Sequence, residues 1–217
     1  MGKKITALKA QKRNHQRVSV FLDGEYAFGL SRIVAAWLQV GQELSDEKIE
    51  GLKDQDDLEV AYQKAIKLIS YRIRSESEIR RYLQDQGIPF ETIEEISVRL
   101  KRNGMVDDLN FARVWVENRN EFRPRSHRML GIELQRKGIP QEIISQIIEE
   151  TPPDDILAYN AAQKQVRRYK RLEWDDFRRK LTSFLARRGF SYETTKPIVN
   201  QVWAELKPDD QFGMTNF

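Results

Sequence analysis

Three stretches of the sequence align with one another: LQDQGIPFETIEEI (83–96), LQRKGIPQEIISQI (134–147) and LARRGFSYETTKPI (185–198). In each, a leucine precedes a glycine by four positions, and successive glycines are 51 residues apart. The positions that recur at this spacing are Gly87/Gly138/Gly189, Leu83/Leu134/Leu185, Ile79/Leu130/Leu181 and Ile88/Ile139/Phe190. Self-similarity at a fixed period is the signature of a repeat protein, in which neighbouring units pack together. The sequence therefore predicts three tandem repeats.

Each repeat is expected to contain three helices. In the first, apolar residues at helical spacing from Leu58 to Ile69 predict one amphipathic helix. Ser75 and Glu78 have the spacing of a capping box and predict a second helix. This helix ends at Gly87, a residue that adopts the left-handed conformation of a helix end without steric penalty, and Pro89 suits the first turn of a third helix. Three helices of about 12–14 residues with their turns account for the period.

The later repeats follow the same plan. Asp107 or Asp108 is expected to cap a helix, and Ser126 and Ser191 are expected to open two others. The expected inner face of the helix after Asp107 consists of Phe111, Ala112, Trp115 and Asn118. Trp115 and Trp203 lie on apolar stripes and are expected in the core, whereas Trp174 and Tyr71 are candidates for exposed contacts.

The first 55 residues have a different pattern. Residues 5–8 and 18–22 are typical of strands, and Asp23-Gly24 predicts a type I′ hairpin turn. A short helix is expected at 31–38, followed by a turn at 40–42. The predicted fold class is mainly α: three tandem three-helix repeats in an elongated array behind a small N-terminal cap that contains a β-hairpin. The predicted segments are the cap (1–55), the repeats (56–106, 107–152 and 153–207) and an irregular tail (208–217).

Composition excludes several function classes. The chain has no cysteine, so disulfides and thiolate metal sites are excluded. It lacks the phosphate-loop, dinucleotide, serine-elbow and zinc-protease motifs, and we expect no enzyme activity, cofactor or metal. His15 and His127 are interpreted as surface residues, and Asp107-Asp108 as a helix cap rather than a carboxylate pair. No apolar run approaches the ~18 residues of a membrane span, and no signal-peptide core follows the basic N-terminus, so a cytoplasmic protein is expected.

Clustered basic residues are the remaining candidates for function. The formal net charge is only +4, but residues 164–188 contain ten basic residues and three acids. An Arg-x-Arg pair, Arg72 and Arg74, recurs 51 residues later as Arg123 and Arg125. The candidate binding residues are Arg72, Arg74, Arg123, Arg125, Arg167, Arg168, Lys170, Arg171, Arg178, Arg179, Arg187 and Arg188. They form either a ladder that contacts phosphates or carboxylates of a partner, or ion pairs with acids of neighbouring repeats such as Glu76, Glu78 and Glu121.

Several of these motifs together resemble the RecX family of regulatory proteins. They are Gly104-Met105-Val106-Asp107-Asp108 followed by Phe111-Ala112, the Gly-Ile-Pro turns at 87–89 and 138–140, and the segment 21–26 (FLDGEY). The resemblance extends from about Ile5 to Leu206 and is weakest in the third repeat.

The resemblance implies three three-helix repeats in an elongated, curved molecule. It also implies binding to the RecA recombinase filament along its helical groove, with modulation of recombination, ATPase and co-protease activities, and binding to single- or double-stranded DNA. We expect a monomer with no membrane partner. The alternative hypothesis is a helical-repeat protein whose main target is DNA itself.

Overall fold

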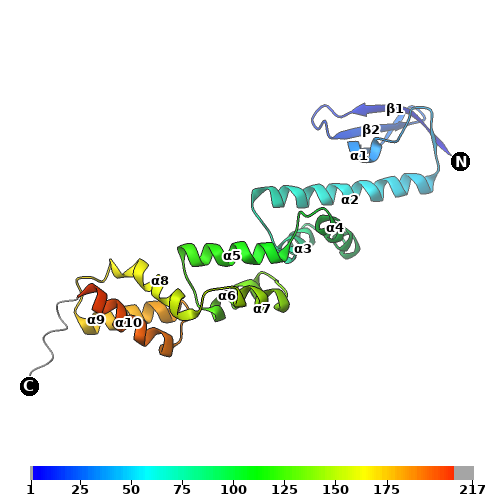
Figure 1. Cartoon of the computed structure of the whole chain (residues 1–217). Coiled ribbons are helices and arrows are strands. Elements are labelled where there is room, and N and C mark those ends of the chain that lie inside the picture. Colours follow the sequence, from blue (N-terminus) through cyan, green and yellow to red (C-terminus); the bar gives the residue numbers. More distant parts are fainter. Residues whose placement is uncertain (1, 208–217) are drawn as a thin grey trace, which may run out of the picture. The chain divides into compact units, whose positions relative to one another are not determined.

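The computed structural model describes residues 2–207, within which there are ten helices and four strands (Figure 1). The strands are β1 (Lys3–Ala10), β2 (Arg17–Leu22), β3 (Glu25–Ser31) and β4 (Glu43–Leu44). The helices are α1 (Arg32–Ala35), α2 (Asp46–Tyr71), α3 (Glu76–Asp85), α4 (Phe90–Arg102), α5 (Asp108–Phe122), α6 (His127–Arg136), α7 (Gln141–Glu149), α8 (Asp154–Val166), α9 (Trp174–Arg187) and α10 (Tyr192–Leu206). The chain forms two compact units: residues up to 74 with 79–106, and residues 75–78 with the chain from 107 onward. The predicted tail, 208–217, lies outside the described residues.

The first unit begins with an antiparallel sheet in the order β3-β2-β1-β4. The Asp-Gly hairpin prediction is confirmed, because Asp23 and Gly24 both have positive φ, 50° and 95°, as a type I′ turn requires. The 40–42 turn leads into β4, which the sequence analysis missed because two residues carry no periodic pattern. One face of the sheet packs with α1 and α2 around a core that includes Ile5, Val20, Leu30, Leu44 and Leu52.

Helix α2 has 26 residues and is longer than the sequence predicts. It begins where the Ser45 side chain accepts the backbone N–H of Lys48, whereas the apolar pattern indicated a start near Leu58. Helix α2 therefore runs through the predicted boundary between the cap and the first repeat, at residues 55 and 56. Residues 46–59 contain seven acids, and this charge hides the early helix because two of the carboxylates turn inward. Asp56 pairs with Arg17 at 2.7 Å and Glu59 with Arg99 at 2.9 Å. The helix expected at 31–38 is shorter, with only α1 helical.

Three three-helix cores follow, as predicted. They consist of the C-terminal half of α2 with α3 and α4, then α5 with α6 and α7, then α8 with α9 and α10. Leu83, Leu134 and Leu185 are completely buried in the three middle helices, so the recurring leucine is a core position in every repeat. Trp115 and Trp203 pack against their cores while remaining partly exposed.

The caps were predicted correctly, but one inner-face residue was not. The side chains of Asp107, Ser126 and Ser191 each accept a backbone N–H three residues onward. The prediction for Asn118 is wrong, because the buried face of α5 is centred on Ala112; this brings Val116 inward and leaves Asn118 exposed at the margin.

Two turn glycines of the second unit lie directly against the start of a preceding middle helix. Gly138 has φ +75°, and a Cβ there would stand 2.2 Å from Ser77 Cβ. Gly189 has φ +92°, and a Cβ there would stand 2.2 Å from Met129 Cγ. A hydrogen bond to a backbone carbonyl accompanies each contact: the Ser75 side-chain Oγ donates to Lys137 O at 2.6 Å, and the Ser126 backbone N–H donates to Arg188 O at 3.1 Å. These glycines therefore both reverse the chain and permit the packing of successive segments.

We expect Gly138→Ala to destabilise the protein more than Gly87→Ala does. Both glycines have positive φ, which costs an alanine about 1–2 kcal/mol, but a Cβ at Gly87 would have open space around it. The clash with Ser77 adds about 1–3 kcal/mol at Gly138. Urea denaturation of both variants measures the difference, and equal losses of stability would show that the close approach contributes nothing.

Candidate partner-binding surface

The predicted cations divide into an exposed group and a half-buried group. The exposed residues are Arg72, Arg123, Arg167, Arg168, Lys170, Arg171, Arg178, Arg179 and Arg187. The half-buried residues are Arg74, Arg125 and Arg188. In each Arg-x-Arg pair the first arginine is exposed and the second is half-buried. The degree of exposure of these side chains therefore also recurs after 51 residues. Whether the exposed cations form a continuous ladder stays a prediction.

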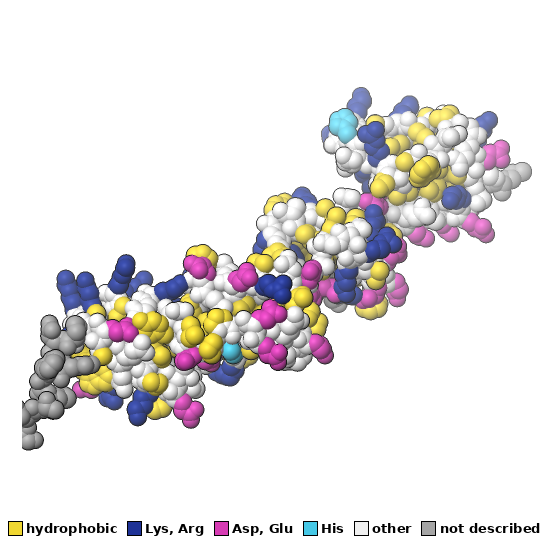
Figure 2. Space-filling view, in the orientation of Figure 1, with side chains coloured by type: hydrophobic (Ala, Val, Ile, Leu, Met, Phe, Trp, Pro, Cys, Tyr) yellow, Lys and Arg dark blue, Asp and Glu magenta, His cyan; other side chains and the backbone are white. Residues whose placement is uncertain are grey.

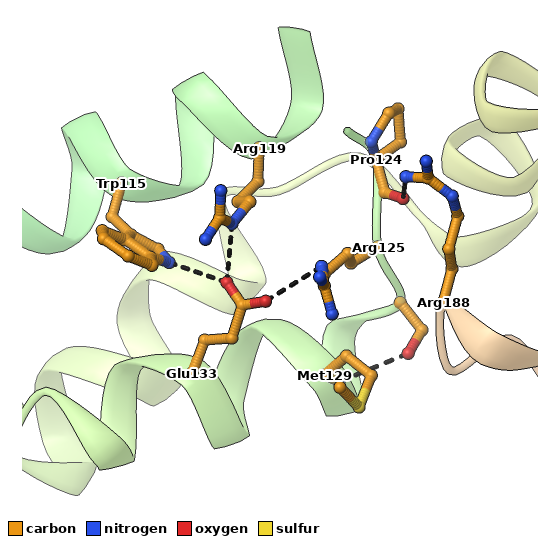
Figure 3. A network of polar contacts seen from close by, with 8 residues as sticks. Trp115, Arg119, Pro124, Arg125, Met129, Glu133 and Arg188 are labelled. Atoms are coloured by element: carbon orange, nitrogen blue, oxygen red, sulfur yellow. Dashed lines mark hydrogen bonds and ion pairs between the residues drawn. The ribbon is translucent and has the colours of Figure 1, made fainter. Parts of the chain in front are cut away.

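Glu133 on α6 organises the half-buried cations of the second repeat (Figure 3). Its side chain is only 12% exposed, and its Oε2 accepts Trp115 Nε1–H at 2.9 Å and Arg119 Nε–H at 2.7 Å. Arg125 Nε lies 2.9 Å from Oε1, as an ion pair. The Arg119 guanidinium also lies 4.4 Å from the centre of the Trp115 ring, a cation–π distance. A single carboxylate therefore holds side chains from α5 and from the α5–α6 linker.

Arg188 brings the third repeat against that linker. Its Nη1 donates to Pro124 O at 2.9 Å (Figure 3). Its guanidinium lies 4.5 Å from the centre of the Phe184 ring. Burial, followed by the charges of Arg125 and Arg123, lowers the pKa of Arg188 from its ordinary value. Three arginines thus concentrate positive charge at one linker, where Glu133 supplies the opposing charge to Arg125.

The Arg72 pair of the first unit has a simpler setting. Arg72 Nη1 donates to Ile73 O at 3.0 Å while its side chain remains exposed. Tyr71 is also exposed, as the sequence analysis considered. An aromatic ring and a cation are therefore adjacent in sequence and both accessible after the end of α2.

The third repeat carries a group of four exposed cations that lie within five residues of one another. Arg167, Arg168, Lys170 and Arg171 lie between α8 and α9, and Figure 2 shows basic side chains gathered over this part of the chain. Arg178 and Arg179 on α9 are partly neutralised by Asp175 and Asp176, at 3.4 and 2.7 Å. The hydrogen bond from Arg179 lowers the pKa of Asp176.

Trp174 is not a free contact residue. It is only partly exposed, and its ring centre lies 5.3 Å from that of Trp203 and 6.5 Å from that of Phe177. It also borders a pocket of about 860 Å³ between α9 and α10, where Tyr192 and Lys196 contribute to the wall. Acidic and basic side chains of α9 mix along this pocket, so its charge favours no single class of ligand.

An apolar patch on the first unit was missed by the sequence analysis. Trp37 is 88% exposed, and Ile33 and Val40 next to it in sequence are also exposed. Their neighbours Ala35 and Leu38 are buried in the sheet core, which directs the patch away from that core. Figure 2 shows apolar side chains at the surface of this unit among Lys and Arg. The sequence carries no signal for the patch, because exposed and buried apolar residues alternate within a few positions.

The remaining polar candidates are helix-end contacts. Asp107 caps α5, and Asp108 Oδ1 accepts Glu76 N–H at 2.8 Å. His127 Nε2 lies 2.8 Å from Pro152 O, and its backbone N–H donates to Asp154. Across residues 2–207 no group of three His, Asp or Glu side chains is placed to hold a metal ion. In the same part of the chain, no helix combines the length and apolar character needed to cross a membrane.

Comparison with known families covers nearly the whole chain. The "Regulatory protein RecX N-terminal domain" matches residues 3–45, and the first, second and third RecX three-helix domains match 61–100, 107–148 and 154–199. "Regulatory protein RecX" of Listeria welshimeri is 32% identical over 212 residues, 96% of this chain and 79% of that protein. The chain belongs to the RecX family. The protein of the same name from Bacillus pumilus is 35% identical over 203 residues, 92% of this chain and 77% of that protein.

A solved RecX structure agrees with this assignment. The crystal structure of a regulatory protein RecX superposes with a TM-score of 0.73 at 28% identity, covering 91% of this chain and 99% of the other. The resemblance that the motifs suggested is confirmed, and so is the mainly helical fold with three three-helix domains and a strand-containing cap. The RecX relatives are named regulatory proteins rather than enzymes.

In this RecX-family chain we expect Glu133→Gln to lower stability by about 1.5–3 kcal/mol, because a neutral amide replaces the carboxylate that accepts two hydrogen bonds and forms an ion pair with Arg125. The matched control is Glu150→Gln, whose ion pair with Arg113 is nearly half exposed at both ends and should contribute at most about 0.5 kcal/mol. Urea denaturation followed by circular dichroism measures both. Equal effects of the two substitutions would contradict a structural role for the Glu133 network.

Proposed function

We propose that this chain is a non-enzymatic, monomeric regulator that binds the RecA recombinase filament in the cytoplasm and inhibits its recombination, ATPase and co-protease activities. The observation that carries the proposal is the exposed cationic group of the third repeat, Arg167, Arg168, Lys170 and Arg171, on a chain whose family is named regulatory. Exposed arginines suit carboxylates and phosphates, because the planar guanidinium binds both in a bidentate manner.

Inhibition requires only differential affinity. A ligand that binds one state of a filament more tightly than another shifts the filament toward that state without any chemical step. Successive three-helix units can contact successive subunits of a repeating target, and linked contacts raise the overall affinity beyond that of each contact. The repeat architecture is therefore suited to a polymeric partner.

The exposed Trp37 patch favours a protein partner over DNA alone. Trp is enriched among the residues that dominate protein–protein binding energy, whereas phosphate contacts depend on cations and hydrogen-bond donors. A tryptophan that is 88% exposed, with Ile33 and Val40 exposed within four residues of it in sequence, is the kind of surface that a protein interface covers.

DNA as the main target is the second candidate, because the same cations suit phosphates. Binding to assembled RecA filament and to naked DNA across a salt series separates the two. For a mode dominated by phosphates, the log–log slope of affinity against salt is about −0.7 to −0.9 for each phosphate neutralised. Tighter binding to naked DNA than to the filament would overturn the proposal.

We expect the joint substitution of Arg167, Arg168, Lys170 and Arg171 by Gln to weaken filament binding at least tenfold, because an exposed group of four charges is lost. The matched control replaces four exposed cations of the first unit, Lys48, Lys67, Arg81 and Arg102, by Gln. Both variants lose the same net charge. Equal losses of affinity would show that total charge, rather than the third repeat, governs binding.

We expect Trp37→Ala to weaken filament binding about tenfold or more while affinity for naked DNA and thermal stability stay unchanged, because the ring is exposed and packs on little. Surface plasmon resonance on immobilised filament measures the loss. Unchanged filament affinity would remove the patch from the interface.

A further inference from the structure

The sheet of the first unit leaves one of its faces uncovered. Cross-strand pairing places Lys9 opposite Ser19, Ser19 opposite Gly29, and Phe21 opposite Tyr26. These residues are exposed or half-buried and alternate with residues of the buried face such as Val20 and Phe28. The face away from α1 and α2 therefore presents its own set of side chains, distinct from the core.

Two aromatic rings lie together on this open face. Phe21 and Tyr26 meet edge to face, with ring centres 6.0 Å apart and planes at 78°. Tyr26 is 60% exposed, and its hydroxyl oxygen lies 3.7 Å from the position that a Cβ would have at Gly29. Gln11 Nε2 and Arg17 Nη2 lie 2.9 and 3.7 Å from the same position, so the Tyr26 hydroxyl points toward polar side chains. The exposure of Tyr26 leaves part of its ring accessible for stacking.

One cation lies against the rings, and two more lie in the loop at the other end of β2. Lys9 Nζ lies 4.8 Å from the centre of the Phe21 ring, and Lys12 and Arg13 are exposed in the adjoining β1–β2 loop. The first 20 residues contain six basic residues and no acid. The acids nearest in sequence, Asp23 and Glu25, lie at the hairpin turn, where Asp23 accepts the backbone N–H of Lys4. Positive charge therefore predominates toward the β1–β2 loop.

We propose that this open face binds single-stranded nucleic acid, with an unpaired base stacked on Tyr26 beside Phe21 and with Lys9, Lys12 and Arg13 at the phosphates. Aromatic platforms interleaved with cations are how proteins bind single strands without reading their sequence, because every base has a π-face. A duplex keeps its base faces inside its own stack and offers no face to Tyr26. The site lies in the N-terminal cap and depends on no part of the proposed filament binding.

The test uses the full chain and labelled oligonucleotides of about 15 thymidines or uridines, with a hairpin duplex for comparison. We expect Tyr26→Ala to weaken single-strand binding about five- to hundredfold in fluorescence anisotropy, and Tyr26→Phe to retain most of it, because the stacking ring is kept. Replacing Lys12 and Arg13 by Gln should reduce the salt slope by about 1–2. Trp37→Ala is the control, an exposed aromatic outside the sheet whose neighbours Ala35 and Leu38 pack into the core on the buried side of the sheet.

A second measurement shows where on the chain the oligonucleotide lies. It is needed because the other exposed cations of the chain also suit phosphates. An oligonucleotide containing 5-iodouracil, crosslinked by light and mapped by mass spectrometry, should label the peptide that contains Tyr26. Equal binding by Tyr26→Ala and the unsubstituted chain, an equal loss in Trp37→Ala, or crosslinks confined to the third repeat would each overturn the proposal. No recombinase is present in these assays, so their failure leaves the proposed filament binding untouched.

Discussion

The packing of a middle helix against the next glycine turn governs the second unit. At Gly138 and Gly189 the backbone must reverse with positive φ and also leave room for Ser77 and Met129 respectively. Hydrogen bonds from Ser75 and Ser126 to the carbonyls of the preceding residues, Lys137 and Arg188, then join successive segments. Because a side chain at either glycine would both strain the backbone and collide, glycine satisfies two requirements that no other residue meets together. The packing of each of these two glycine turns against the preceding segment therefore depends on the glycine.

The same junctions explain why the cations are of two kinds. Arg125 and Arg188 lie where the α5–α6 linker meets the turn that follows α9, and each has a partner in the second repeat. Glu133 forms an ion pair with Arg125, and the Pro124 carbonyl accepts a hydrogen bond from Arg188. The four basic residues between α8 and α9 lie in a segment without such a junction and remain exposed. The cations that stabilise the fold and the cations that are exposed are therefore chemically alike, and they differ only in what surrounds them.

The first unit offers surfaces of another character. Its sheet buries one face with α1 and α2, and the short α1 directs Trp37 outward because Ala35 and Leu38 are needed in the core. The opposite face carries the Phe21–Tyr26 pair with Lys9 above it. A small domain with a thin core cannot cover all its apolar side chains, and those that remain exposed in this unit include the aromatic residues Tyr26 and Trp37.

Much of the secondary structure and core of this protein could be predicted from its residues alone, because these features depend on local interactions. Leu83, Leu134 and Leu185, the caps Asp107, Ser126 and Ser191, and the Asp-Gly hairpin depend on neighbours within a few positions, so their patterns are visible in the chain. The early half of α2 was hidden because Asp56 and Glu59 are paired with Arg17 and Arg99, residues distant in sequence. The exposure of Trp37, the pairing of Arg125 with Glu133 and the approach of Ser77 to Gly138 likewise needed the folded chain. Whether a given side chain is solvated or buried depends on segments far away along the chain, and only packing brings those segments together.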